Sequence, residues 1–122
     1  MIILLSPSKT LDMEGSSPIA RPTTPLLLDE SEILIKTTRK LKIDDLKNLM
    51  GISDKLAQLN HARFKAFTTP FTKANAKPCL FAFRGDVYDG LDADSFSTEE
   101  VAYAQKHLRI LSGLYGLLRP CD

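Results

Sequence analysis

The sequence holds 122 residues, of which 43% are hydrophobic and 25% charged, with 16 basic against 15 acidic side chains. This is the composition of one globular domain, and it excludes collagen, coiled coils and wholly disordered chains. The longest apolar run covers residues 1–5 and is far shorter than the roughly 20 residues of a membrane helix. No basic segment precedes that run as in a signal peptide, so we expect a cytoplasmic protein without a membrane partner.

Cysteine spacing and charge distribution indicate which kinds of binding site the chain can form. Cys79 and Cys121 share no metal-binding spacing, so two reduced thiols are expected and neither a metal site nor a cofactor is indicated. Residues 31–66 carry eight Lys or Arg and four Asp or Glu, a net charge of +4, whereas residues 80–103 carry one Arg and six acids, a net charge of −5. A local basic segment of this kind can bind nucleic acid although the whole chain is nearly neutral.

The first half of the chain predicts a strand, a long loop and three helices. A strand is expected at residues 2–5, where a run of isoleucine and leucine stops at Ser-Pro, and four prolines between residues 6 and 25 predict a loop. Asp29 is a favourable N-cap, and Gly51 is a favourable end for a helix. The three helices are expected at residues 29–41, 44–50 and 53–67.

The second half predicts strands alternating with a helix. Residues 79–83 are a continuous apolar run of strand length, followed by turn-forming Gly and Asp residues. A helix is expected from Ser97 to about Leu108, because Glu100 follows Ser97 at the spacing of a capping box. Residues 109–118 then predict a strand entering a glycine turn. Strands separated by helical segments predict an α/β fold with a mixed sheet.

The pattern at residues 49–57 is typical of a helix-hairpin-helix, which we place at about residues 44–67. In that motif a Gly-apolar-Gly turn exposes backbone N–H groups at the start of the second helix, where they hold a DNA phosphate. The corresponding residues are Gly51, Ile52 and Ser53, and Lys55 adds a basic side chain. Ser53 replaces the second glycine, which is a departure because serine resists positive φ. The structural alternative is an ordinary pair of helices joined by a tight glycine turn.

Three segments that follow predicted strands are candidates for a ligand site or a catalytic site, because ligands of α/β proteins gather at the carboxyl ends of strands. Ser6, Lys9 and Thr10 could bind an anion. Asp86 could act as a base or metal ligand and Tyr88 as a hydrogen-bond donor, and Arg119 follows the last strand. The structural alternatives are a solvated polar loop at residues 6–10 and a plain turn at residues 84–90, with Asp86 capping a short helix.

Four blocks taken together resemble a known family. ILLSPSKTLD, ISDKLAQLNHARF, FRGDVYDGL and LSGLYGLLRPCD are similar, in that order, to motifs of the YaaA family of bacterial peroxide-stress proteins, also called UPF0246 or DUF328. The resemblance spans residues 1–122 and implies a YaaA-like fold with DNA binding through the helix-hairpin-helix. It also implies protection against hydrogen peroxide by lowering intracellular free iron. Family members are about twice as long, so the chain resembles the N-terminal part of one longer domain, whose C-terminal half would be its partner.

Two classes of function therefore follow from the sequence. One is a peroxide-stress protein that binds duplex DNA without sequence specificity through residues 51–55. The other is an enzyme or small-ligand protein in which Lys9, Asp86, Tyr88 and Arg119 converge at the strand ends. Juxtaposition of these side chains in one pocket would favour the second class.

Overall fold

The computed structural model describes residues 1–19 and 21–122. The chain forms two compact units, one of residues 1–28 with 71–122 and the other of residues 29–70. Within the described residues, no helix has the length and apolar character needed to cross a membrane.

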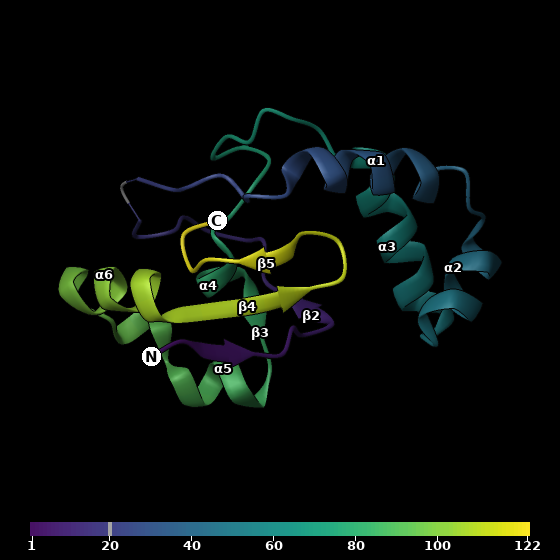
Figure 1. Ribbon diagram of the computed structural model, residues 1–122. Helices are drawn as coiled ribbons and strands as arrows, with labels where there is room; N and C mark the ends of the chain where they lie inside the picture. The colour runs from purple at the N-terminus through teal and green to yellow at the C-terminus, as the bar shows by residue number, and fades with distance from the viewer. Residues whose placement is uncertain (20) are drawn as a thin grey trace. The chain divides into compact units, whose positions relative to one another are not determined.

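A three-stranded mixed sheet organises the first unit (Figure 1). Its strands are β1 (Ile3–Leu5), β4 (Leu108–Ser112) and β5 (Gly116–Leu118), in the order β1-β4-β5. β1 is parallel to β4, and β5 returns antiparallel to it. Ile110 is paired with Leu5 on one side and with Leu118 on the other, so this fully buried residue lies at the centre of the sheet.

The turn between β4 and β5 is fixed by local hydrogen bonds. The Ser112 hydroxyl oxygen accepts hydrogen bonds from the Leu114 and Tyr115 N–H groups at 3.3 and 3.1 Å. Gly116 has φ +71°, and a Cβ on it would lie 2.7 Å from a Leu27 methyl carbon. A glycine is therefore favoured at this position by its conformation, whereas the exposed Leu27 side chain could move away from a Cβ.

The remaining elements of the first unit pair or pack beside this sheet. β2 (Thr10–Leu11) is antiparallel to β3 (Phe83–Arg84), and β3 lies between α4 (Cys79–Ala82) and α5 (Asp86–Leu91). A short 3₁₀ turn, Ala93–Ser95, precedes α6 (Thr98–His107). Ser97 and Glu100 form the expected capping box at the start of α6, with the Glu100 carboxylate accepting from the Ser97 N–H at 2.7 Å.

The core of the first unit lies on one face of the sheet. Ile110 and Leu118 pack with Cys79, Phe83 and Tyr88 in one buried cluster. A second buried cluster joins α4 to the turn at Ala93, to α6 and to the start of β4 through Leu80, Phe81, Ala93, Ala104 and Leu108. All four residues of α4 are buried, which makes this short helix the central contact on that face.

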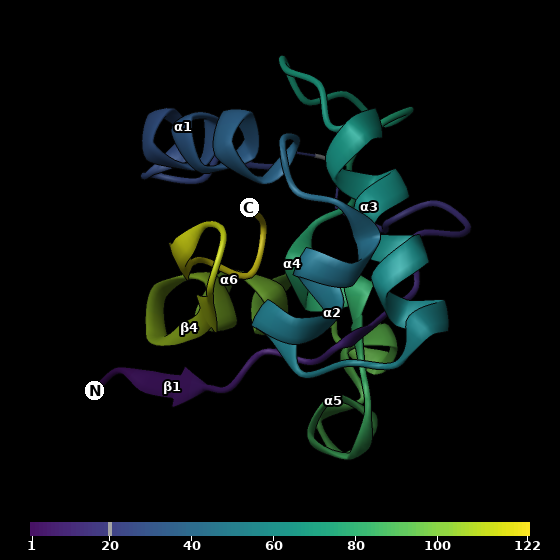
Figure 2. The same ribbon diagram turned by 90° about the vertical axis from the view of Figure 1, so that its right-hand side faces the viewer.

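The second unit is made of three helices, α1 (Leu28–Thr38), α2 (Ile43–Met50) and α3 (Asp54–Ala66), the first of which begins one residue before the unit. α2 and α3 lie side by side (Figure 2). Arg39 follows α1 and donates hydrogen bonds to the carbonyl oxygens of Phe64 and Phe67 at the end of α3. A cation at these carbonyls satisfies acceptors that have no partner within the helix.

The mixed α/β class expected from the sequence is confirmed, and the expected helices lie within a few residues of α1, α2, α3 and α6. The strand expected at residues 79–83 is wrong, because Cys79–Ala82 form a helix and only Phe83–Arg84 are extended. A helix buried on every side has the same unbroken apolar sequence as a buried strand. β2 and α5 lie in segments that were expected to be loop or turn.

Candidate functional site

Residues 51–53 form the turn between α2 and α3. Gly51 ends α2 in the left-handed region, at φ 59° and ψ 45°, and its N–H donates to the Lys47 carbonyl oxygen. Ile52 is buried. Ser53 has φ −67°, and its hydroxyl oxygen accepts from the Leu56 N–H at 3.3 Å as the N-cap of α3. The second position therefore requires no glycine in this chain, since Ser53 stands in extended backbone.

Small and apolar residues hold the two helices together. Ala57 is fully buried on α3, and Leu46 is 1% exposed on α2. A larger side chain at position 57 would force the helices apart. We call α2, residues 51–53 and α3 the α2–α3 hairpin.

Charges of both signs lie at the start of α3. The Lys47 ammonium nitrogen is 2.7 Å from a carboxylate oxygen of Asp54, the first residue of α3, and a side-chain hydrogen bond to Asp54 raises the pKa of Lys47. Lys55 is exposed beside them. An anion approaching this helix end would meet the Asp54 charge, which Lys47 neutralises, and the free ammonium of Lys55.

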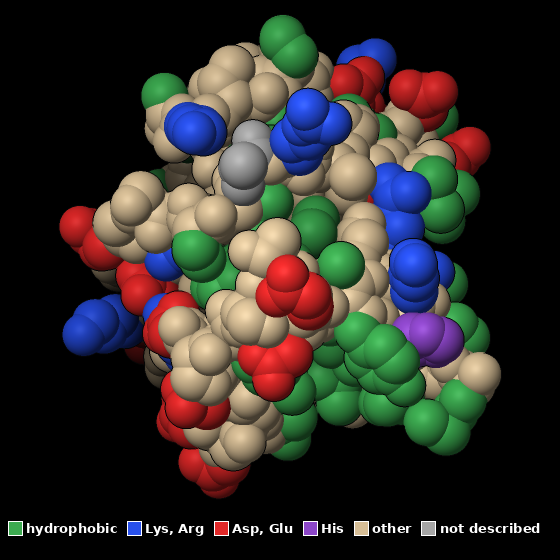
Figure 3. Space-filling model, turned by 90° about the vertical axis from the view of Figure 1, so that its left-hand side faces the viewer, with side chains coloured by type: hydrophobic (Ala, Val, Ile, Leu, Met, Phe, Trp, Pro, Cys, Tyr) green, Lys and Arg blue, Asp and Glu red, His purple; other side chains and the backbone are tan. Residues whose placement is uncertain are grey.

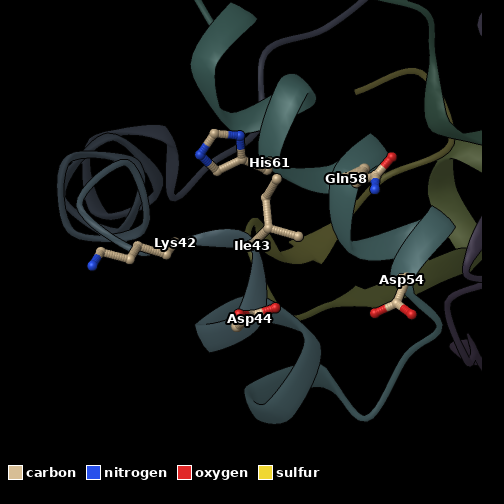
Figure 4. Close-up of a pocket in the computed structure, with 6 residues that line it drawn as sticks. All are labelled: Lys42, Ile43, Asp44, Asp54, Gln58 and His61. Atoms are coloured by element: carbon tan, nitrogen blue, oxygen red, sulfur yellow. The ribbon is translucent and has the colours of Figure 1, made fainter.

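An open depression of about 520 Å³ lies along the same two helices (Figure 4). Its lining residues come from the start of α2 and from α3: Lys42, Ile43, Asp44, Asp54, Gln58 and His61. The lining combines two carboxylates with a lysine, an amide and an imidazole. Within the described residues, no group of three or more His, Cys, Asp or Glu side chains could hold a metal ion.

The first unit brings two distant blocks of the sequence together beside the carboxyl end of β1. Thr10 is paired with Arg84 across β2 and β3. The Tyr88 hydroxyl donates to the Ser6 carbonyl oxygen at 2.6 Å, and a Cβ on Gly85 would lie 3.3 Å from the Ser8 hydroxyl oxygen. The loop at residues 6–10 and the segment at residues 84–88 therefore form one substructure, which we call the strand-end cluster.

Within the strand-end cluster the candidate side chains differ in exposure. Lys9, Thr10 and Asp86 are exposed, whereas Tyr88 is 5% exposed and stacks on Phe83 with ring centroids 5.4 Å apart. Burial raises the pKa of Tyr88 to about 12. Tyr88 is therefore protonated at neutral pH and serves as a hydrogen-bond donor rather than a base.

An ion-pair network borders the strand-end cluster. Arg84 lies between Asp12 at 3.2 Å and Asp94 at 3.4 Å, and Lys77 lies 3.6 Å from Asp12. The pKa of Asp12 is lowered by the hydrogen bond from the Glu14 N–H and then by the hydrogen bond from Arg84. The two ion pairs of Asp12 join residues more than 60 positions apart, so no sequence spacing indicates them.

Arg119 belongs to a different set of contacts. Its guanidinium donates to both Asp122 carboxylate oxygens and to the Thr24 carbonyl oxygen, and the Asp122 side chain is fully buried. Leu118 is paired with Ile110, so Arg119 continues toward the amino end of β4, whereas Ser6 follows β1 toward the carboxyl end. Arg119 thus fixes the last residues of the chain and lies apart from the contacts around Tyr88.

Comparison with known proteins identifies the relationship. Residues 1–122 match the family described as "Peroxide stress protein YaaA". The chain belongs to this family. It is 57% identical over all its residues to a UPF0246 protein of Alteromonas mediterranea and 55% identical to one of Shewanella sediminis, covering 47% and 48% of these relatives. The chain thus spans about half the length of the curated relatives it matches, as the resemblance read from the sequence implies.

Proposed function

We propose that this protein acts in the response to peroxide stress and binds duplex DNA, without sequence preference, through the α2–α3 hairpin. Membership of the YaaA family supports the role in peroxide stress. The observation that carries DNA binding is the turn at residues 51–53, with left-handed Gly51, buried Ile52 and the exposed start of α3.

The start of α3 supplies donors suited to a phosphate. Four N–H groups at the start of any α-helix lack acceptors within the helix, and the helix dipole adds partial positive charge there. The Leu56 N–H donates to the Ser53 hydroxyl oxygen, and the N–H groups of Asp54 and Lys55 lie in the same first turn of α3. A phosphate contact of this kind reads no base, so binding would be independent of sequence.

The negative charge of Asp54 repels a phosphate at this position, so a substitution of Asp54 provides a second test of the proposal. Its carboxylate stands at the helix start, 2.7 Å from Lys47. Replacing Asp54 with Asn removes the negative charge and releases Lys47 toward the phosphate. A protein that binds DNA elsewhere would gain no more from this change than from Asp89→Asn, which removes an exposed carboxylate from the other unit.

The test measures binding of the full-length protein to duplexes of unrelated sequence over a range of salt concentrations. We expect Lys55→Glu to weaken binding to every duplex and to flatten the salt dependence, whose slope is about −0.9 per phosphate neutralised. Asp54→Asn should strengthen binding. The matched control is Lys73→Glu, which makes the same charge change at an exposed residue of the other unit. Equal losses for Lys55→Glu and Lys73→Glu would reject the hairpin as the DNA site.

We also propose that the protective effect includes a lower concentration of free iron in the cell, which limits iron-driven oxidation of DNA and protein. The family resemblance alone supports this part. Chelatable iron after peroxide exposure should be higher in cells that lack the gene and normal in cells complemented with it. Complementation with Lys55→Glu separates the two activities, because it impairs DNA binding and should leave the iron concentration normal.

A second candidate function is binding of a small anionic ligand at the strand-end cluster. The contacts of Tyr88 with Ser6 and of Gly85 with Ser8 support it, because they join the loop that carries Lys9 to the segment that carries Asp86. Inorganic phosphate and mononucleotides are suitable probes in calorimetry. Lys9→Ala should abolish a binding signal that Lys73→Ala retains, and the absence of any signal with the unmodified protein would remove this candidate.

A further inference from the structure

The sheet of the first unit has two unlike faces. Residues alternate along β4, so buried Leu108 and Ile110 point to the core, while Leu111 points to the opposite side. The registers place Leu4 on the side of Arg109 and Leu111, and Leu117 directly opposite Leu111. We call Leu4, Leu111 and Leu117 the outer sheet face.

The three leucines of the outer sheet face are exposed, and Arg109 on the same side donates hydrogen bonds to the carbonyl oxygens of Gln105 and Leu108. Leu4 is 59% exposed, Leu111 44% and Leu117 39%, and Ile2, two residues before Leu4, is 55% exposed. Seen from the side of α6, hydrophobic side chains gather in one area of the surface (Figure 3). Contiguous exposed apolar areas of a few hundred Å² mark a site of interaction.

The edge of the same sheet is also open. β1 pairs with β4, and within the described residues no strand pairs with its other edge. β1 lies at the margin of the first unit in Figure 2, away from α4. An apolar edge strand without a charged or proline residue carries no protection against pairing with another strand, and Ile3, Leu4 and Leu5 include neither.

We infer that the outer sheet face and the free edge of β1 are the docking surface for the further half of the family chain, which lays a strand along β1 and covers Leu4, Leu111 and Leu117. The relatives supply an occupant of the right size, since the match covers 47% of the Alteromonas mediterranea protein. A second copy fits less well. A stable dimer buries about 800 Å² on each partner, whereas this face offers three leucines that are between 39% and 59% exposed.

The test uses the full-length Alteromonas mediterranea relative, with a single cysteine placed at the positions that align with Leu4, Leu117 or Leu49 in a background without accessible cysteines. Leu49 is the matched control because it is 73% exposed on α2, in the other unit. In the folded protein, we expect the cysteines introduced at positions 4 and 117 to react with a maleimide at least tenfold more slowly than the cysteine introduced at position 49. Hydrogen exchange of the unmodified protein should show that every amide of residues 3–5 is protected, including those that do not bond to β4. This measurement needs no variant, so misfolding of a variant does not affect it.

The outcomes are distinct. Labelling at positions 4 and 117 as rapid as at position 49, or unprotected amides in β1, would overturn the inference. Sedimentation identifies the occupant. A monomer with protected residues supports the further half of the chain. A dimer whose protection is lost on dilution would assign the surface to a second copy and overturn the inference.

Discussion

Gly85 joins the two blocks of the strand-end cluster. Its φ of +127° lies in a region that other residues rarely adopt, and a Cβ would lie 3.3 Å from the Ser8 hydroxyl oxygen. Gly85→Ala should therefore lower the free energy of unfolding by about 1–3 kcal/mol, measured by urea titration. Gly90 is the control, because it lies in α5 and its Cβ would meet nothing within 4 Å. Gly90→Ala should stabilise the protein by about 0.5–1 kcal/mol, and equal destabilisation by both variants would contradict this account of Gly85.

The thiol of Cys79 is expected to be unreactive despite the connection with peroxide stress. Burial raises the pKa of Cys79 to about 12, and the thiol lies 3.0 Å from the Arg119 carbonyl oxygen. Since only the thiolate reacts with peroxide, the reactive fraction at neutral pH is about a thousandfold below that of an ordinary cysteine. Mass spectrometry after brief exposure to peroxide should find Cys79 reduced in the native protein and oxidised in the urea-unfolded protein at alkaline pH. Rapid oxidation in the native state would show that the buried position opens readily.

At the scale of single elements, the start of α6 depends on the charge of Glu100. Hydrogen bonds from Ser97 lower the pKa of the Glu100 carboxyl. A carboxyl with a lowered pKa in the folded state stabilises the fold above its unfolded pKa, about 4.3, and this stabilisation is lost as pH falls through the folded pKa. We expect the free energy of unfolding to decrease between pH 6 and pH 3 less in Glu100→Gln than in the unmodified protein. Glu99→Gln, in the same helical turn, is the control and should retain the full decrease.

The elements that could be predicted from the sequence are those with local signals. Ser97 and Glu100 mark α6, Gly51 marks the end of α2, and the helix positions follow. The strand predicted at residues 79–83 is wrong, because a helix buried on every side shows no alternation of apolar and polar residues in its sequence. For the candidate site, the sequence indicated the two loops but not their contacts, because the hydrogen bond from Tyr88 to Ser6 closes 82 positions of chain. Such pairings depend on tertiary packing, which no spacing in one sequence specifies.

For the molecule as a whole, the two charged segments of the sequence fall in different units. The acidic residues 80–103 lie in the first unit, whereas residues 31–66, with a net charge of +4, lie in the second. The second unit holds the α2–α3 hairpin. Two of its cations are committed to structural contacts, Arg39 to carbonyl oxygens and Lys47 to Asp54. The positive charge available to DNA therefore depends on side chains such as Lys55, which is why one substitution there is expected to change the salt dependence.

The apolar outer sheet face determines how the 122-residue chain behaves by itself. With Leu4, Leu111 and Leu117 exposed, association of copies removes apolar area from water at about 25 cal/mol per Å², and a few hundred Å² is enough for weak association. We expect the sedimentation coefficient of the isolated chain to rise with its concentration. A Leu4→Lys, Leu117→Lys double variant should remain monomeric. Association would bury a lysine ammonium, and this costs more free energy than burial of the remaining apolar area provides.

The control for this prediction carries the same added charge on the other unit. Leu49 and Leu59 are 73% and 43% exposed on α2 and α3, so a Leu49→Lys, Leu59→Lys variant changes solubility through net charge alone. It should still associate. If both double variants abolish association equally, general charge repulsion explains the effect and the sheet face is not the contact. If the unmodified chain is monomeric at every concentration, the exposed leucines are tolerated in water and the prediction is wrong.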